Sequence, residues 1–244
     1  MDYPQDIVTE ASRYLLGRGI TVLQGNRFGD TEEAHVNRLA TYMALNGLRP
    51  GFQPGGASSP EGGAYAPEGE KEVADMGCGF GAVPWFLSKQ LLPHAHFWLI
   101  NRNRFQLGHC PLGPAFTRRL EDMCETSIPG YSVDLVMFNY SLCHVEQVAA
   151  LKEAARIARP GRGKLFVYDY ERVSGDDALT EKILRATFLS DQAFRALCDT
   201  TGWQGVETFR VDGDDTLFRE AVNDDALYDS MFDHLRPVIW RAHR

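Results

Sequence analysis

Short apolar runs alternate with stretches of helical spacing over most of the chain. Compact apolar runs predict strands, and segments whose apolar residues lie three or four positions apart predict helices. The expected strands cover residues 73–76, 96–100, 115–120, 134–139, 203–211 and 236–243, with a further strand ending at 168–171. The expected helices cover residues 5–16, 31–45, 80–91, 145–158, 180–189 and 191–200. This alternation predicts an α/β domain with a mostly parallel sheet and helices on both of its faces.

The segment ahead of the first strand differs from the rest of the chain. Residues 1–50 hold two of the expected helices, and we interpret them as a helical cap. Residues 51–70 are rich in glycine, proline and serine and predict a flexible insertion. The remaining residues, 71–244, then form one domain.

Charge and cysteine usage restrict the class of partner. The formal net charge of −8 argues against nucleic acid as the main partner, because such surfaces usually carry basic patches. The five cysteines are dispersed without metal-binding spacing, which favours reduced thiols in a cytoplasm over a disulfide or zinc framework. The sequence contains no apolar run long enough for a membrane span and no apolar leader. We therefore expect a cytoplasmic protein that does not bind membranes.

The densest motif is Asp75-Met-Gly-Cys-Gly-Phe-Gly81, at the end of the first expected strand. Its glycines, Gly77, Gly79 and Gly81, allow positive φ angles and let a nucleotide-like ligand pass close to the backbone. The dinucleotide fingerprint places glycines in a similar turn, but here an acid precedes them. A carboxylate at that position suits a cationic ligand better than a phosphate.

The motif resembles motif I of the class I S-adenosylmethionine (SAM)-dependent methyltransferases. A second match is Arg159-Pro-Gly161, which separates a helix from a strand, as in the segment that follows the motifs of that family. The resemblance implies a Rossmann-like sheet of seven strands with an antiparallel last strand, a helical lid at the N-terminus, and SAM as cofactor. Within the motif, it assigns Asp75, Gly77, Cys78, Gly79 and Gly81 to cofactor binding.

The second strand ends at Asn101, where an acid usually accepts hydrogen bonds from both ribose hydroxyls. The stretch from Ile100 to Gln106 resembles instead a pattern of the cyclopropane fatty acid synthase and prenyl diphosphate C-methyltransferase branch. In that branch a glutamine takes over the ribose contact. The resemblance thus implies that Gln106 binds ribose with the help of Asn101, and that Arg102 belongs to the same cofactor site.

The ends of the third and fourth strands add further candidates for the cofactor site. The pair Asp122-Met123 matches the methyltransferase position that hydrogen-bonds the adenine amino group and packs against its ring. Asn139 ends the apolar fourth strand. Because ligands of open α/β sheets bind outside the carboxyl ends of the strands, we expect all three residues to face the cofactor.

The candidate catalytic residues follow the fourth and fifth strands. Tyr140 and His144 come after the fourth strand, and Tyr168, Asp169 and Tyr170 end the fifth. His144 or Asp169 could remove a proton from an oxygen or nitrogen acceptor, and the aromatic faces could stabilise a cation. Alternatively, His144 only begins a helix and the tyrosines are aromatic core at a strand end. We place Tyr170 with the acceptor-binding residues.

The segment ahead of motif I supplies further candidate contacts to the acceptor. In many small-molecule methyltransferases this segment folds over the cofactor and lines the acceptor pocket. The resemblance therefore implies contacts from Arg27, Phe28, His35 and Arg38. The alternative is an ordinary helical hairpin with solvated charges.

The aromatic candidates and the Gln106 pattern favour methylation of a carbon atom in a small molecule. The specific acceptor that we expect is an isoprenoid diphosphate, with Mg²⁺ accompanying the diphosphate and no metal bound by the protein itself. One alternative is O- or N-methylation of a polar metabolite. The other is a cofactor-binding regulatory module without catalysis. The chain acts alone or as a homodimer in each case.

Overall fold

The computed structural model describes residues 5–17, 71–90, 92–174, 185–210, 229 and 233–244. Helix α1 (Gln5–Gly17) is followed by β1 (Glu72–Met76), α3 (Ala82–Gln90), β2 (His96–Asn101), α4 (Arg104–His109), β3 (Phe116–Leu120) and β4 (Leu135–Asn139). The next elements are a short 3-10 helix η1 (Leu142–His144), α5 (Gln147–Ile157), β5 (Lys164–Arg172), α7 (Asp191–Thr201), β6 (Gln204–Arg210) and β7 (Leu235–His243).

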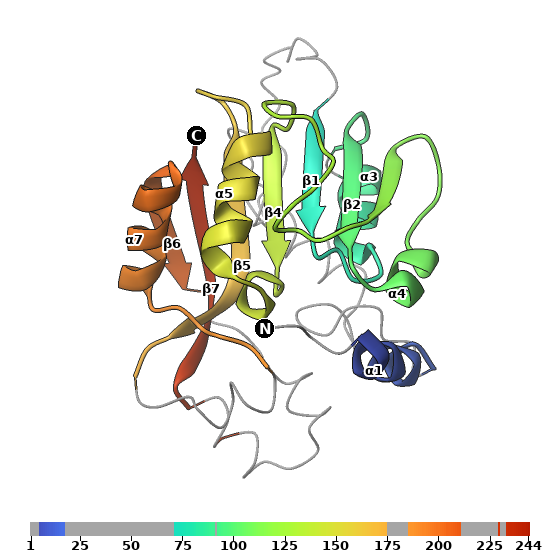
Figure 1. Cartoon of the computed structure of the whole chain (residues 1–244), viewed down its shortest axis with the longest axis horizontal. Helices are drawn as coiled ribbons and strands as arrows, with labels where there is room; N and C mark the ends of the chain where they lie inside the picture. Colours follow the sequence, from blue (N-terminus) through green and yellow to red (C-terminus); the bar gives the residue numbers. More distant parts are fainter. Residues whose placement is uncertain (1–4, 18–70, 91, 175–184, 211–228, 230–232) are drawn as a thin grey trace, which may run out of the picture.

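The strands form one seven-stranded sheet in the order β3-β2-β1-β4-β5-β7-β6. The pairs among β3, β2, β1, β4 and β5 are parallel, whereas β7 is antiparallel to both β5 and β6. The chain order reverses between β1 and β4, which places the ends of these two strands at a topological switch point. The expected mostly parallel sheet with an antiparallel last strand is confirmed (Figure 1).

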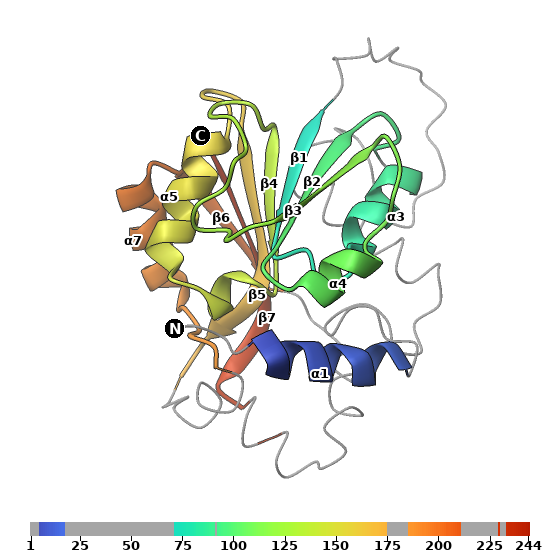
Figure 2. The ribbon, with the colours of Figure 1, turned by 45° about the vertical axis from the view of Figure 1, so that its right-hand side comes forward.

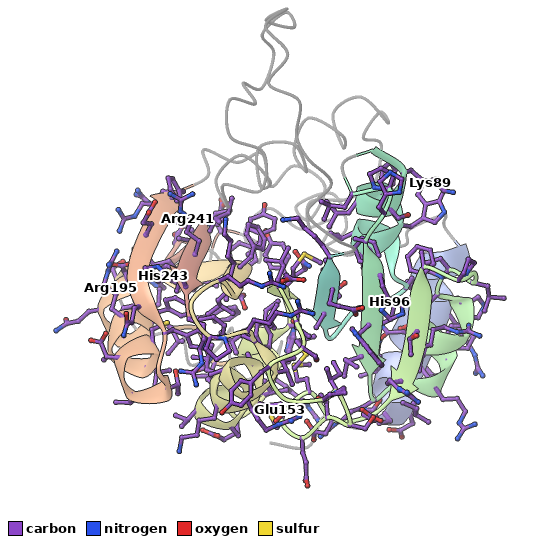
Figure 3. All side chains as sticks on the ribbon, turned by 90° about the horizontal axis from the view of Figure 1, so that it is seen from above. Lys89, His96, Glu153, Arg195, Arg241 and His243 are labelled. Atoms are coloured by element: carbon purple, nitrogen blue, oxygen red, sulfur yellow. The ribbon has the colours of Figure 1, made fainter. Side chains whose placement is uncertain are left out.

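Helices cover both faces of the sheet, as the nearly continuous apolar strands predict. In Figure 2, α3 and α4 lie on one side of the strands and α5 and α7 on the other. One core cluster joins Phe97 and Leu99 to Leu87 of α3, and the other joins Ala74 and Ile100 to the α5 side. Figure 3, seen from above, shows Lys89 of α3 and Glu153 of α5 on opposite sides.

Helix α1 lies across the lower end of the sheet, beneath α4 (Figure 2). This is the end at which β1, β2 and β4 finish, which is the edge where ligands of such folds bind. The expected helix at residues 5–16 is confirmed by the observed bounds, Gln5–Gly17.

The expected start of the helix after the fourth strand shifts by two residues, because Glu146 acts as its N-cap. The Glu146 carboxylate accepts from the backbone N–H groups of Val148 and Ala149, so α5 begins at Gln147. His144 therefore belongs to η1 and not to α5. The helix expected at residues 191–200 is confirmed as α7, with Ser190 as its N-cap and Gly202, at φ 87°, as its left-handed end.

The prediction of a helix over residues 180–189 is wrong for its described part. Residues 186–188 have no regular secondary structure, Leu189 forms an isolated bridge with Glu171, and Arg185 has a positive φ of 47°. Their backbone groups bond to other elements: the Thr187 N–H donates to the Cys143 carbonyl at 2.8 Å, and the Leu189 carbonyl accepts from the Arg172 N–H at 3.0 Å. We call residues 185–189 the strap, because they run alongside η1 and the end of β5.

Several predictions lie outside the described residues. They are the helix at 31–45, the insertion at 51–70, and the acceptor contacts Arg27, Phe28, His35 and Arg38. Among the described residues, no helix is both long and apolar enough to cross a bilayer.

Candidate active site

The glycine turn after β1 takes the predicted shape. Gly77, Gly79 and Gly81 have φ angles of 85°, 55° and 72°. The backbone N–H groups of Gly77 and Cys78 both donate to the Ile100 carbonyl, each at 3.0 Å, so the turn is tied to the end of β2. The chain can double back so tightly because glycine carries no Cβ.

The three glycines are needed for different reasons. A Cβ on Gly77 would lie 2.6 Å from Cβ of Ser141 and 2.8 Å from Cε of Met123, and one on Gly81 would lie 2.7 Å from Cδ of Pro111. A Cβ on Gly79 would have no described atom within 4 Å. Gly77 and Gly81 are therefore packed against neighbours, whereas Gly79 has open space beside it among the described residues.

Asp75 lies directly ahead of this turn as a buried carboxyl group. Its side chain is 1% exposed, and Asn139 donates to Oδ1 at 3.1 Å. Burial raises the pKa of Asp75 to about 7, although the hydrogen bond from Asn139 lowers it in part. Among the described residues no cation contacts Asp75. A ligand ammonium group would supply the positive charge that this carboxylate lacks, which fits the cationic methionine end of SAM.

The structure brings together Asn101 and Gln106, both predicted to contact ribose. Asn101 Nδ2 donates to Gln106 Oε1 at 2.9 Å and to the Gly79 carbonyl at 3.2 Å. Cys78, in contrast, turns its thiol away towards Cys110, with the two sulfur atoms 3.8 Å apart. Burial raises the pKa of Cys78, which keeps it a neutral thiol. Cys78 can thus serve the turn through its backbone.

The predicted adenine contacts lie beside the same turn. Arg102 Nη1 donates to Asp122 Oδ2 at 2.8 Å, and the Cys124 N–H donates to Asp122 Oδ1 at 2.9 Å. Burial works against the charge of Asp122, but these two donors outweigh it and hold the pKa of Asp122 below its usual value. Met123 reaches Gly77, so an apolar surface and an acceptor oxygen lie next to the glycines.

An aromatic cluster occupies the ends of β4 and β5. The Tyr140 ring lies 4.5 Å from the Tyr168 ring and 5.2 Å from the Tyr170 ring, measured between centroids. Tyr140 itself has a positive φ of 51°, held in place by its N–H, which donates to the Tyr168 carbonyl at 2.7 Å. Such strained residues gather at functional sites. The predicted tyrosines therefore form one aromatic group at the carboxyl edge.

Asp169 lies on the opposite face of β5 from Tyr168 and Tyr170, because side chains alternate along a strand. It is buried, and its two oxygens accept from the N–H groups of Cys143, at 3.1 Å, and Tyr170, at 2.9 Å. Burial raises the pKa of Asp169 to about 6, although these two hydrogen bonds lower it in part. Through Cys143, Asp169 fixes η1 and hence the position of His144.

His144 is the last residue of η1 and contacts the strap. Its Nδ1 is 3.4 Å from the Arg185 carbonyl, which can accept only from a protonated nitrogen. Burial lowers the pKa of His144, against the effect of this hydrogen bond. The ring is therefore neutral at pH 7, with its proton on Nδ1 and a lone pair on Nε2. Such a ring can accept a proton.

Sequence reasoning missed three residues that help to build this edge. Phe188, in the strap, packs edge-on against Tyr170 with centroids 6.1 Å apart. Asn103 caps α4, and Ser12 of α1 accepts from Gln106 Nε2 at 2.8 Å. Asn103 could have been found, because asparagine favours the N-cap position. The sequence offers no signal for the contacts of Phe188 and Ser12 with distant segments.

The described residues include no group of three or more His, Cys, Asp or Glu side chains arranged to hold a metal ion. The prediction of Mg²⁺ concerns an ion held chiefly by a diphosphate, so it does not depend on such a cluster.

Comparison with known proteins identifies the domain around this site. Residues 74–167 match the family model described as a methyltransferase domain. This stretch runs from β1 into β5 and includes the glycine turn, Asn101, Asp122 and Asn139. None of the curated proteins compared with the chain matches it.

Three solved structures share the fold over most of their length. A protein from Galdieria sulphuraria assigned as a sarcosine dimethylglycine methyltransferase is 15% identical, with a TM-score of 0.73 over 96% of this chain and 98% of that one. The cyclase SpnF is 14% identical, with a TM-score of 0.72 over 97% and 94%. Geranyl diphosphate C-methyltransferase from Streptomyces coelicolor A3(2) is 13% identical, with a TM-score of 0.65 over 90% and 86%.

At identities this low, the structures establish the fold and leave the acceptor open. The cyclase illustrates the point, since its name describes a reaction other than methyl transfer. The family model, the glycine turn and the sheet order agree with one another. The chain therefore contains a methyltransferase domain, and its fold is that of the class I SAM-dependent methyltransferases.

Proposed function

We propose that this methyltransferase transfers the methyl group of SAM to a carbon atom of an isoprenoid diphosphate. Two observations support SAM as the cofactor. Open space lies beside Gly79 among the described residues, and the buried carboxyl group of Asp75 has no described cationic partner. SAM, when bound, supplies an electrophilic methyl group on a sulfonium. The protein then has to bind, orient and exclude water, which can account for much of the acceleration.

The cofactor contacts divide among the turns after β1, β2 and β3. Asp75 would bind the ammonium group of the cofactor, with Asn139 holding the carboxylate in place. Asn101 and Gln106 would contact the ribose, and Asp122 and Met123 the adenine. Arg102 would act through Asp122, whose carboxylate it contacts.

The aromatic cluster supports carbon methylation. Attack by an alkene leaves a carbocation, and desolvated aromatic faces can stabilise a cation by roughly 2 kcal/mol. Tyr140, Tyr168 and Tyr170 lie at the edge where the acceptor would meet the methyl group. In addition, the solved structure from Streptomyces coelicolor is a complex with Mg²⁺, geranyl diphosphate and S-adenosylhomocysteine (SAH). We therefore retain Mg²⁺ in the proposal, held by the diphosphate.

The final proton of carbon methylation needs an acceptor. We assign this role to His144, which ends the 3-10 turn after β4 and whose lowered pKa favours a neutral ring that can accept a proton. Asp169 is then a positioning residue: both of its oxygens accept backbone N–H groups, and it holds the 3-10 turn that carries His144.

N-methylation of a small amine is the second candidate. A neutral His144 could equally take the proton of an amine acceptor. The Galdieria sulphuraria structure, assigned to methylation of sarcosine and dimethylglycine, favours this candidate.

The test is a labelling experiment with methyl-labelled SAM, Mg²⁺ and isopentenyl, dimethylallyl, geranyl and farnesyl diphosphates. After dephosphorylation, label in one prenyl alcohol is the expected result, and His144→Ala should lower kcat about 100-fold with little change in SAH affinity. Label in sarcosine or ethanolamine derivatives, tested in parallel, would favour the second candidate. SAH binding without label in any acceptor would contradict both.

A further inference from the structure

A chain of amide hydrogen bonds connects α1 with the glycine turn. It runs from Ser12 through Gln106 and Asn101 to the Gly79 carbonyl. Ser12 is 2% exposed and Asn101 is 8% exposed, so most of the chain is shielded from water. A second contact docks the same helix, because Asn103 Nδ2 donates to Thr9 Oγ1 at 3.0 Å.

The direction of every hydrogen bond in this chain follows from one backbone group. The Asn103 N–H can only donate, and it lies 2.8 Å from Asn101 Oδ1, which must therefore accept. The other end of that amide, Asn101 Nδ2, must then donate to Gln106 Oε1. Gln106 is consequently oriented with Nε2 towards Ser12, whose hydroxyl oxygen accepts at 2.8 Å.

This orientation leaves Gln106 with one remaining group of each kind. Nε2 carries two hydrogens and Oε1 two lone pairs, and the described contacts use one of each. One of two adjacent ligand hydroxyls can accept from the remaining Nε2 hydrogen, while the other donates to the remaining Oε1 lone pair. The ribose of SAM has such a pair of hydroxyls. Without Ser12, the carboxamide is held at Oε1 alone, so its remaining donor and acceptor are less firmly fixed in space.

We infer that Ser12 is a positioning residue of the cofactor site, which holds the Gln106 carboxamide in the orientation set by Asn101 towards the two ribose hydroxyls. The inference rests on the proposed binding of SAM. It gives α1 a role in the site, since one hydroxyl of this helix restrains the Nε2 end of Gln106. Thr9, also on α1, contacts Asn103 but is not part of the hydrogen-bond chain from Ser12 to Gly79.

The experiment measures the affinity of SAH and of its 2′-deoxy and 3′-deoxy analogues by calorimetry. It compares the wild type with Ser12→Ala and with Thr9→Val. Thr9→Val is a matched variant, because it removes a docking contact of α1 that is not part of the hydrogen-bond chain from Ser12 to Gly79. We expect the wild type to bind SAH about tenfold more tightly than the weaker analogue, a ratio typical of one good hydrogen bond. Ser12→Ala should reduce that ratio to about twofold, and Thr9→Val should keep it.

The ratio separates orientation of Gln106 from mere docking of α1. If Ser12→Ala keeps the full ratio, or if Thr9→Val lowers it equally, the inference is wrong although SAM binding stands. A wild type that binds neither SAH nor its analogues would overturn the proposed function as well. Thermal unfolding of each variant without ligand shows whether the fold is retained, and both variants should unfold within a few degrees of the wild type.

Discussion

The turns after β1 and β2 are held by hydrogen bonds, whereas those after β4 and β5 combine hydrogen bonds with packed aromatic rings. On the first side, the N–H groups of Gly77 and Cys78 meet the Ile100 carbonyl, and Asn101 meets Gly79. On the second side, Tyr140 and Tyr170 pack with Phe188 of the strap. The cofactor side is thus sensitive to backbone shape and amide direction, and the acceptor side to the volume of side chains.

In the proposed function, this contrast separates a cofactor site of fixed geometry from an acceptor site that tolerates exchange of side chains. Hydrogen bonds are directional, so a site built from them accepts one arrangement of ligand groups. Apolar packing is non-directional and tolerates exchange among side chains of similar volume. Changes of acceptor should therefore come through the strap and the tyrosines, with the glycine turn unchanged.

The largest effect should come from Gly79→Ala on the cofactor side. The new methyl group would enter the space beside the turn, and overlap with a ligand there should cost about 3 kcal/mol, or roughly 100-fold in SAH affinity. Calorimetry with SAH measures this loss. Gly113→Ala is the matched control, because Gly113 also has a positive φ, 136°, and no described atom within 4 Å of a Cβ.

Both alanine variants should lose about 1 kcal/mol of folding stability, from the left-handed backbone alone. Only Gly79→Ala should lose cofactor affinity. Equal SAH binding by Gly79→Ala and the wild type would show that the cofactor does not lie against this turn, and the division of the edge into two sides would fail.

The second-largest effect should be a dependence of SAH affinity on pH, caused by Asp75. Burial raises the pKa of Asp75 to about 7, and the proposed ammonium contact needs the carboxylate. SAH affinity should therefore fall as the pH drops through 7, and be about tenfold lower at pH 6 than at pH 8. Asp75→Asn should remove this dependence, and Asp75→Ala should weaken binding at pH 8 by at least roughly 1.5 kcal/mol. Calorimetry across this pH range measures both.

Asp75 also affects folding, but with the opposite dependence on pH, because the folded state prefers the protonated carboxyl group whereas ligand binding needs the carboxylate. Between about pH 4 and pH 7 the folded chain holds a proton on Asp75 that the unfolded chain has released. Its contribution to the free energy of unfolding therefore decreases as the pH rises through that window. A pH-independent SAH affinity in the wild type would contradict the assignment of Asp75 to the cationic end of the cofactor.

The smallest effect should come from Phe188→Leu on the acceptor side. Leucine keeps much of the apolar volume but loses the edge contact with Tyr170, so the free energy of unfolding should fall by about 1 kcal/mol. We expect the KM for the acceptor to rise several-fold, with SAH affinity unchanged within twofold. Steady-state kinetics measures the KM for the acceptor, and calorimetry measures the SAH affinity.

Phe194→Leu is the matched control for this prediction. Phe194 is also buried and stacks on Trp240, with centroids 4.4 Å apart, but it belongs to the core cluster on the other face. It should lose similar stability without a change in the KM for the acceptor. If Phe188→Leu weakened SAH binding as much as acceptor binding, the two sides would not be separable.

The cofactor side could be predicted from the sequence because its signals are local. Three glycines within five positions, one acid ahead of them and an apolar run on either side determine the turn. Asn101 and Gln106 are five residues apart, so their contact needs only the first turn of α4. The mostly parallel sheet with its antiparallel last strand followed from the alternation of elements together with the family resemblance.

The acceptor side could be predicted only in part. The tyrosines were found because they end strands, but the strap was predicted as a helix from its local spacing. Its backbone instead bonds to Cys143 and Arg172, and no pattern within residues 180–189 encodes those partners. Similarly, the opposite directions of Tyr168 and Asp169 follow from strand alternation, but which of them faces the acceptor depends on tertiary packing.

The nine-pair antiparallel ladder between β5 and β7 has a consequence for how the protein is synthesised. Residues 164–172 pair with residues 235–243, and among the described strands the backbone of β6 pairs with β7 alone. During synthesis, β1 to β5 can assemble first, while one edge of β5 still exposes unpaired backbone groups. Because such an edge recruits other strands, the nascent chain is most prone to misassociate before β7 emerges from the ribosome.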